Sequence, residues 1–280
     1  MVLLCAIWGF NQVAVKVASA EIPPFVQAGL RSLCAAFVVM AWCRFRGIKA
    51  FQNDGTWKAG LLAGAFFTIE FALFFEGVPR TTAARAVLFF YTAPLFIAIG
   101  AHFFVPNERM RLVHVFGLIL AFAGVAVCFS DGLRAAAPAS SLIGDLLCLL
   151  AAIFWGATMI AIKATRLVTI APERTLLYQL GTSSLLLPIG LVIGESLPSS
   201  ISAIPALSFA FQVVVVASAT FLTFVWLMTR YDAGKLSSFI FLAPLFGVLF
   251  GWMLLGETVN AGLLAGAVLI CSGIWLVNRR

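Results

Sequence analysis

Charge is scarce in this sequence. Of its 280 residues, 10% are Asp, Glu, Lys or Arg, and 62% are hydrophobic. Soluble domains carry about 25% charged residues, so this chain has too few polar side chains to cover a surface in water. The shortage predicts an all-α integral membrane protein, in which the 27 Phe and 7 Trp can face lipid or lie at the membrane interface.

Metal ligands and catalytic motifs are lacking too. The two histidines, His102 and His114, have no partner at ligand spacing, and the six cysteines form no Cys-x-x-Cys pair. There is no G-x-S-x-G, no H-E-x-x-H and no Gly-Lys phosphate loop. We therefore expect no metal, no cofactor and no enzymatic activity.

Positive charge is present, at a net +7, but it is dispersed. Lys and Arg occupy short segments between apolar runs, which is the positive-inside pattern and not a nucleic-acid surface. With the N-terminus inside, thirteen Lys and Arg residues face the inside and only Lys16, Arg80, Arg85 and Arg134 face the outside. The sequence predicts a protein of the inner (plasma) membrane with both termini in the cytoplasm.

Ten runs are long and apolar enough to be membrane-spanning helices, each of about 20 residues. Six windows contain no Asp, Glu, Lys or Arg: 86–107, 112–130, 175–194, 196–229, 236–256 and 258–278; the window 196–229 holds one span and a connector rich in Pro and Ser. Four further runs lie at roughly 2–18, 24–43, 57–77 and 141–163. The first run resembles a signal peptide, but no basic residue precedes it and the same segment recurs later, so we expect a retained helix.

The two halves of the chain resemble each other at an offset of 147–150 residues. The Trp-Gly pair at 8–9 recurs at 155–156, and a lysine follows each pair at the same spacing. Residues 80–96 match 230–246 at seven of seventeen positions, and both segments end in Ala-Pro-Leu-Phe. Five spans in each half is an odd number, so the second half (135–280) is predicted to be inverted relative to the first (1–134). Inverted repeats of this kind place a substrate site between the halves, near the membrane midplane.

The second half carries Ala-Pro-Leu-Phe at 243–246, Leu-Gly-Glu at 255–257 and glycines at 266 and 273. This pattern resembles the EamA family of the drug/metabolite transporter superfamily, and the aromatic-rich single chain also resembles the YddG-type aromatic amino-acid exporters. The first half has Pro-Asn-Glu at 106–108 in place of Leu-Gly-Glu. The resemblance implies a ten-helix transporter of a small molecule, and it leaves the substrate open.

Two matched pairs of residues suggest structural roles. Pro94 and Pro244 lie within spans, where each removes a backbone hydrogen bond, so they are candidate hinges or static bends. Glu108 and Glu257 precede the last span of each half, where a carboxylate meets the positive end of the helix dipole. We expect helix capping for these two acids, with substrate contact as the alternative.

Charged residues inside a membrane are candidate functional groups. Arg31 and Glu70 each lie about seven residues from the outer end of a span, hence at similar depth. They are expected either to form a buried ion pair or to act separately. In the second case Arg31 meets the carboxylate of a substrate, and Glu70 binds its ammonium group or a coupled proton.

Uncharged candidates for the cavity lie on the repeated spans and on the span at 86–107. They are Trp8, Asn11, Tyr91, Trp155 and Thr158, with His102 and Gln179 as weaker candidates and Tyr178 at an inner interface. Glycine pairs four residues apart are expected to pack helices within one protomer; a monomer is favoured and a homodimer stays open.

We therefore predict a secondary transporter that exports amino acids or related amphipathic metabolites by alternating access. A multidrug or nucleotide-linked metabolite carrier is the alternative within transporters. An intramembrane lipid-modifying enzyme is the alternative of another class.

Overall fold

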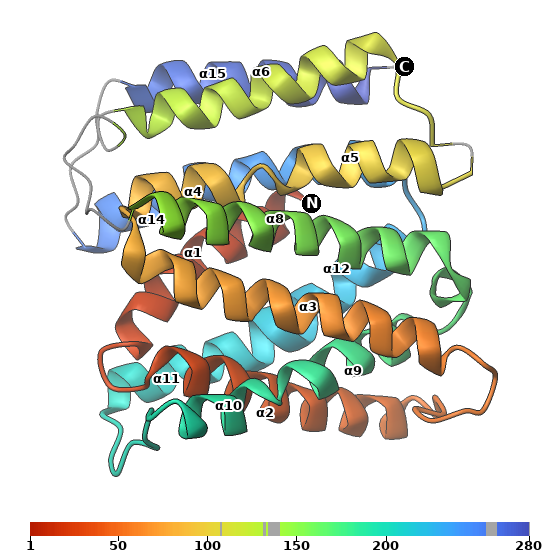
Figure 1. Ribbon diagram of the computed structural model, residues 1–280, viewed down its shortest axis with the longest axis vertical. Helices are drawn as coiled ribbons and strands as arrows, with labels where there is room; N and C mark the ends of the chain where they lie inside the picture. The colour runs from red at the N-terminus through yellow and green to blue at the C-terminus, as the bar shows by residue number, and fades with distance from the viewer. Residues whose placement is uncertain (107, 131–132, 134–140, 256–261, 280) are drawn as a thin grey trace.

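The computed structural model describes residues 1–106, 108–130, 133, 141–255 and 262–279, and this part of the chain is helical without β-strands (Figure 1). The helices of the first half are α1 (Val2–Ala18), α2 (Pro24–Phe45), α3 (Trp57–Gly77), η1 (Val78–Arg80), α4 (Ala83–Phe90), α5 (Ala93–Phe104) and α6 (Leu112–Cys128). Those of the second half are α8 (Ser141–Ala164), η2 (Arg166–Thr169), α9 (Pro172–Ser183), α10 (Leu186–Val192), α11 (Ala203–Phe211), η3 (Gln212–Thr220), α12 (Phe221–Met228), α13 (Ala233–Ser238), η4 (Phe239–Phe241), α14 (Leu242–Leu255) and α15 (Gly262–Asn278).

The described helices include seven stretches long and apolar enough to cross a membrane, and three shorter apolar helices, α1, α6 and α15. Together they match the ten spans expected from the sequence. Large apolar side chains face outward on these helices, among them Phe103, Leu112 and Leu264, which are 73%, 77% and 76% exposed. Such a surface is stable against lipid and not against water, so the chain is a multi-pass membrane protein.

The fourth and ninth spans are each built from more than one helical piece. In the fourth span α4 ends at Phe90 and α5 begins at Ala93, and in the ninth α13, η4 and α14 follow one another. Pro94 lies in the first turn of α5 and Pro244 in that of α14. Proline is tolerated there because its missing N–H has no partner in a first turn. The repeated proline therefore accompanies a break in the helix in each half; its role as a hinge stays a prediction.

The inverted relation of the halves is visible in the pairing of α6 with α15, which run together along one edge of the molecule (Figure 1). A Cβ on Gly117 would lie 2.8 Å from the carbonyl of Gly273, and a Cβ on Gly124 would lie 2.7 Å from that of Gly266. The positions pair in opposite order, so the helices are antiparallel. In the repeat, Gly117 matches Gly266 and Gly124 matches Gly273. Exchanging the two halves therefore turns the Gly117–Gly273 contact into the Gly124–Gly266 contact, as expected for two halves related by a two-fold axis.

The repeated motifs contact each other across the halves. A Cβ on Gly9 would lie 2.5 Å from the Cβ of Phe246, and one on Gly156 would lie 3.0 Å from the Cβ of Phe96. The Trp-Gly motif of each half thus packs on the Ala-Pro-Leu-Phe motif of the other. The chain has the ten-helix fold of two inverted five-helix halves. The predicted boundary between residues 134 and 135 lies outside the described residues and stays a prediction.

Polar contacts near the helix ends also join the halves. Arg174 of α9 donates a hydrogen bond of 2.6 Å to Asp54, in the α2–α3 connection. This guanidinium and Thr56 hold the pKa of the Asp54 carboxyl well below its usual range. Because folding lowers the pKa of Asp54, its carboxylate stabilises the folded protein at pH values above the usual Asp pKa. This stabilisation is lost only as the pH falls through the lowered pKa. Asp54 therefore stays ionised near neutral pH and adds no pH dependence there.

Candidate functional site

A cavity of about 160 Å³ lies between the two halves. The first half lines it from α1, α2, α3 and the α4–α5 break, and the second half from α8, α9, η3 and α12. Its walls are mainly aromatic and apolar, with a few polar groups. The lining residues are Trp8, Asn11, Gln12, Val15, Arg31, Phe67, Glu70, Phe71, Phe74, Phe75, Phe90, Tyr91, Trp155, Met159, Gln179, Val216, Phe221, Phe224 and Val225.

Three buried polar atoms in this cavity have no hydrogen-bond partner among the described residues. They are Oδ1 of Asn11, Nε of Arg31 and Oε2 of Glu70. A buried polar group without a partner costs about 1–3 kcal/mol, and more when it is charged. The cavity therefore presents one donor and two acceptors that a polar ligand can satisfy.

Arg31 and Glu70 are 4% and 5% exposed, and no ion pair joins them in the described structure. The guanidinium carbon of Arg31 instead lies 4.8 Å from the ring centroid of Phe71, in a cation–π contact. Of the two roles expected from the sequence, the geometry does not provide the direct ion pair. Both side chains line one cavity, which fits the alternative that they meet a ligand.

The aromatic candidates are held in place by contacts across the halves. Trp8 donates from Nε1 to Oγ1 of Thr220 at 2.9 Å, and its ring meets that of Phe224 edge-on. Trp155 stacks on Phe90 with ring centroids 5.1 Å apart. Each contact joins a side chain of one half to one of the other, so the halves share the aromatic wall of the cavity.

Some residues singled out in the sequence lie elsewhere. Thr158 is fully buried, does not line the cavity, and donates to the carbonyl of Phe154 in its own helix. His102 accepts a hydrogen bond from the N–H of Met110 and so orders the α5–α6 connection. Tyr178 packs against Gly60 of α3, and Gln179 lines the cavity. Glu257 lies outside the described residues.

Glu108 differs from the expectation for its helix. Its carboxylate accepts the N–H of Ala233, at the start of α13, at 2.7 Å, and forms an ion pair with Lys163 of α8. The side chains of the pair are 9% and 8% exposed. Lys163 also donates to the carbonyl of Tyr231. Glu108 thus supports a helix start in the opposite half, not that of α6, and ties three segments together.

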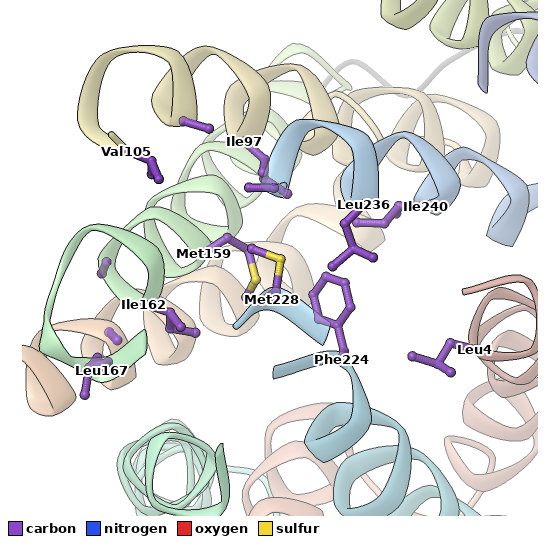
Figure 2. Close-up of a cluster of buried hydrophobic side chains, with 14 of the residues drawn as sticks. Leu4, Ile97, Val105, Met159, Ile162, Leu167, Phe224, Met228, Leu236 and Ile240 are labelled. Atoms are coloured by element: carbon purple, nitrogen blue, oxygen red, sulfur yellow. The ribbon is translucent and has the colours of Figure 1, made fainter. Parts of the chain in front are cut away.

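An apolar cluster adjoins the cavity (Figure 2). Met159 and Phe224 belong both to the cluster and to the cavity wall, and Figure 2 shows their side chains grouped with Met228. Further members, such as Val105 and Ile162, come from the ends of α5 and α8 near the Glu108–Lys163 pair. Along α8, the cluster therefore continues from Met159 in the cavity wall to Ile162, the neighbour of Lys163.

The phenylalanines of α3 were missed as cavity residues. Phe71, Phe74 and Phe75 follow Glu70 at one, four and five positions, so Phe74 lies one helical turn from Glu70 on the same face, and Phe71 and Phe75 lie one turn from each other. That spacing was available in the sequence, but α3 is apolar on all sides and its pattern does not show which face is buried. In the described part of the chain, no group of three His, Cys, Asp or Glu residues could hold a metal ion.

A polytopic helical fold, two inverted halves and a shared central cavity define a membrane transporter. The chain belongs to the EamA-like transporter family, whose model matches residues 1–130 and 142–279.

Relatives along nearly the whole chain carry transporter names. The chain is 30% identical over 286 residues to the uncharacterized transporter YvbV of Bacillus subtilis (strain 168), covering 100% of this chain and 90% of the relative. It is 27% identical over 289 residues to a probable amino-acid metabolite efflux pump of Escherichia coli (strain K12), covering 98% and 92%. A solved crystal structure superposes with a TM-score of 0.84 at 22% identity, over 99% of this chain and 96% of that chain, which shows the shared fold.

Proposed function

We propose that this transporter exports amino acids or closely related amphipathic metabolites. The observation that carries the proposal is the set of three unpartnered atoms in the cavity, on Asn11, Arg31 and Glu70. An amino acid in its zwitterionic form has a carboxylate for the guanidinium and an ammonium for the two oxygen acceptors. The naming of a relative as a probable amino-acid metabolite efflux pump supports the same substrate class.

The cavity wall supports a substrate with an apolar or aromatic side chain. Phe90, Trp155 and the phenylalanines of α3 offer ring faces and edges to such a group. Aromatic amino acids are therefore the first substrates to test.

The size and charge of the cavity favour this substrate over the two other transport alternatives. Pockets for drug-sized ligands have volumes of about 300–1,000 Å³, and this cavity has about 160 Å³. A nucleotide-linked metabolite would bring several phosphate charges, whereas Arg31 is the single cation among the lining residues and Glu70 opposes it. For a lipid-modifying enzyme, the described lining of the cavity offers one carboxylate and no Ser, Cys, His or Lys side chain beside it.

The proposed mechanism is alternating access in the inner membrane, with both termini in the cytoplasm. The halves rock about the central cavity, and the cluster of Figure 2 with the Glu108–Lys163 pair forms the closed cytoplasmic gate. Transport is driven by exchange, by the substrate gradient or by a coupled ion. A reporter active only in the cytoplasm, fused at the C-terminus, should give a signal, and a reporter active only in the periplasm should not.

The test of the proposal is counterflow in proteoliposomes against a panel of labelled amino acids, with pH and sodium varied separately. We expect exchange of aromatic or other apolar amino acids. Arg31→Gln should weaken binding by roughly 30-fold or more, because a buried charge partner contributes about 2–5 kcal/mol. The matched control is Lys58→Gln, which removes a cation at the start of α3 that does not line the cavity. Exchange of nucleotide-linked metabolites or bulky cationic drugs, and of no amino acid, would refute the proposal.

A further inference from the structure

A second pocket, of about 280 Å³, lies at the ends of α5 and α15 and the starts of α6 and α13. It shares no lining residue with the central cavity. Four cationic side chains line it, and they come from three separate parts of the sequence. These are Arg109, Arg111, Lys235 and Arg279.

The carboxylates around this basic pocket do not neutralise it. Glu108 is already paired with Lys163, and Asp232 lies 3.6 Å from the ammonium of Lys235. No ion pair joins any of the three arginines to a carboxylate in the described part of the chain. The pocket therefore presents three cationic groups that are free to bind an anion.

An apolar groove of about 320 Å³ continues from the basic pocket along α15. Phe239 and Leu242 form one wall, and Arg279 lines both the groove and the pocket. Cys271, Trp275 and Arg279 are spaced by four residues, so they lie on one face of α15. Trp275 is 59% exposed, and the guanidinium carbon of Arg279 lies 5.0 Å from its ring centroid. This face of α15 is a lipid-facing stripe that ends in a cation at the pocket.

We propose that the basic pocket and the groove together bind one anionic phospholipid of the surrounding bilayer. The arginines receive the phosphate, because a guanidinium matches phosphate geometry with two parallel hydrogen bonds. An acyl chain lies in the groove against Phe239, Leu242 and Trp275. A basic pocket between transmembrane helices is a suitable site for an anionic head group. A soluble phosphate compound would use the pocket and leave the adjoining groove empty, which is why the lipid is the better match.

Native mass spectrometry of the full-length protein in detergent, with phosphatidylglycerol added, measures the affinity directly. Phosphatidylcholine is the zwitterionic comparison, and glycerol 1-phosphate is the head group without acyl chains. We expect phosphatidylglycerol to bind the wild-type protein more tightly than either. The variant Arg109→Gln/Arg111→Gln should weaken this binding by roughly 25-fold, at about fivefold for each cation removed near the membrane surface. Its weaker binding of phosphatidylcholine should fall less, because the choline cation already opposes the arginines.

The end of α2 supplies matched controls. Trp42 and Arg46 there repeat the arrangement of Trp275 and Arg279, with the guanidinium 5.5 Å from the ring centroid, but they line neither the pocket nor the groove. Arg44→Gln/Arg46→Gln removes two cations from the same face of the protein, and Trp42→Ala is the control for Trp275→Ala. We expect both controls to bind phosphatidylglycerol as the wild type does, and Trp275→Ala to bind it more weakly.

Three results would overturn the proposal. The first is an equal loss of affinity in the variants at α2 and at the pocket, which would show general attraction between charges. The second is equal binding of phosphatidylglycerol and phosphatidylcholine. The third is displacement of phosphatidylglycerol by glycerol 1-phosphate at comparable concentration, which would indicate a site for a soluble anion.

Discussion

Replacement of Glu108 by Gln tests the proposed cytoplasmic gate. Gln keeps an oxygen that can accept the N–H of Ala233, but it removes the charge beside Lys163. Both side chains of the pair are more than nine-tenths buried. Removal of one partner of a buried pair costs about 3–5 kcal/mol, because the other charge is left without compensation. Lys163 keeps its bond to the carbonyl of Tyr231, so we take the lower end, about 3 kcal/mol.

This cost falls mainly on the closed state, because opening of the gate would expose Lys163 to water. A loss of about 3 kcal/mol changes the ratio of closed to open molecules by roughly 150-fold. The readout uses the substitution Met228→Cys, because the side chain at this position is fully buried in the apolar cluster. Its reaction with a membrane-impermeant maleimide is followed in inside-out vesicles, in a background that replaces the exposed Cys271 and half-buried Cys34 by Ser. Glu108→Gln should raise the labelling rate by one to two orders of magnitude.

Two comparisons make this experiment decisive. Lys163→Gln combined with Glu108→Gln should recover much of the closure, because no unpaired charge is left buried. Glu76→Gln removes a carboxylate from the exposed pair with Arg80, whose side chains are 46% and 39% exposed, and should change little. The pair does not hold the gate closed if the Glu108→Gln and Glu76→Gln variants are labelled at the same rate. The same conclusion follows if the effects of Glu108→Gln and Lys163→Gln on the labelling rate are additive.

Three further predictions concern the cavity and the helix packing. The double variant Arg31→Gln/Glu70→Gln should lose transport and unfold at the same or a higher temperature than the wild type, because it removes two buried charges that do not pair. The single variant Glu70→Gln should fold normally, and it should lose the pH dependence of transport if Glu70 carries a coupling proton. A thermal scan and transport across pH check both, and loss of stability in the double variant would mean that the two residues support each other. Gly273→Ala should destabilise the protein by about 1–3 kcal/mol, because the new Cβ would lie 2.4 Å from the carbonyl of Gly117. The control Gly181→Ala places its Cβ where no atom lies within 4 Å, so it should be neutral or stabilising in the same thermal scan. Thr158→Val should leave the transport Michaelis constant unchanged, and a marked rise in it would place the side chain in the cavity.

The number of spans and the internal duplication are determined by the sequence alone. A membrane-spanning helix must supply its own hydrogen bonds and about 20 apolar residues, so composition along the chain is sufficient to find it. The Trp-Gly and Ala-Pro-Leu-Phe motifs could be recognised as repeats because both are short, specific strings. Their contact across the halves, Gly9 on Phe246 and Gly156 on Phe96, needed the structure.

The cavity residues were only partly predictable. Arg31 and Glu70 stood out because a charge in an apolar span is costly without a role, and Trp8 and Trp155 stood out by the repeat. Position on a repeated span predicts Thr158 as a cavity residue, whereas the cavity lining contains the phenylalanines after Glu70 and not Thr158. Both differences have one cause: a helix that is apolar all round gives no sign of its rotation about its axis.

The partner of Glu108 shows the same division between sequence and tertiary structure. A carboxylate before a span suggests interaction with the nearest helix start, because that is the contact available within the local chain. Packing of the two halves brings Lys163 and the N–H of Ala233 into contact with the Glu108 carboxylate, and a buried carboxylate binds the donors that surround it. The sequence alone shows which groups are charged and how many spans they flank. Which of these groups meet depends on the docking of helices more than fifty residues apart in the chain, so it is visible in the three-dimensional structure and not in the sequence.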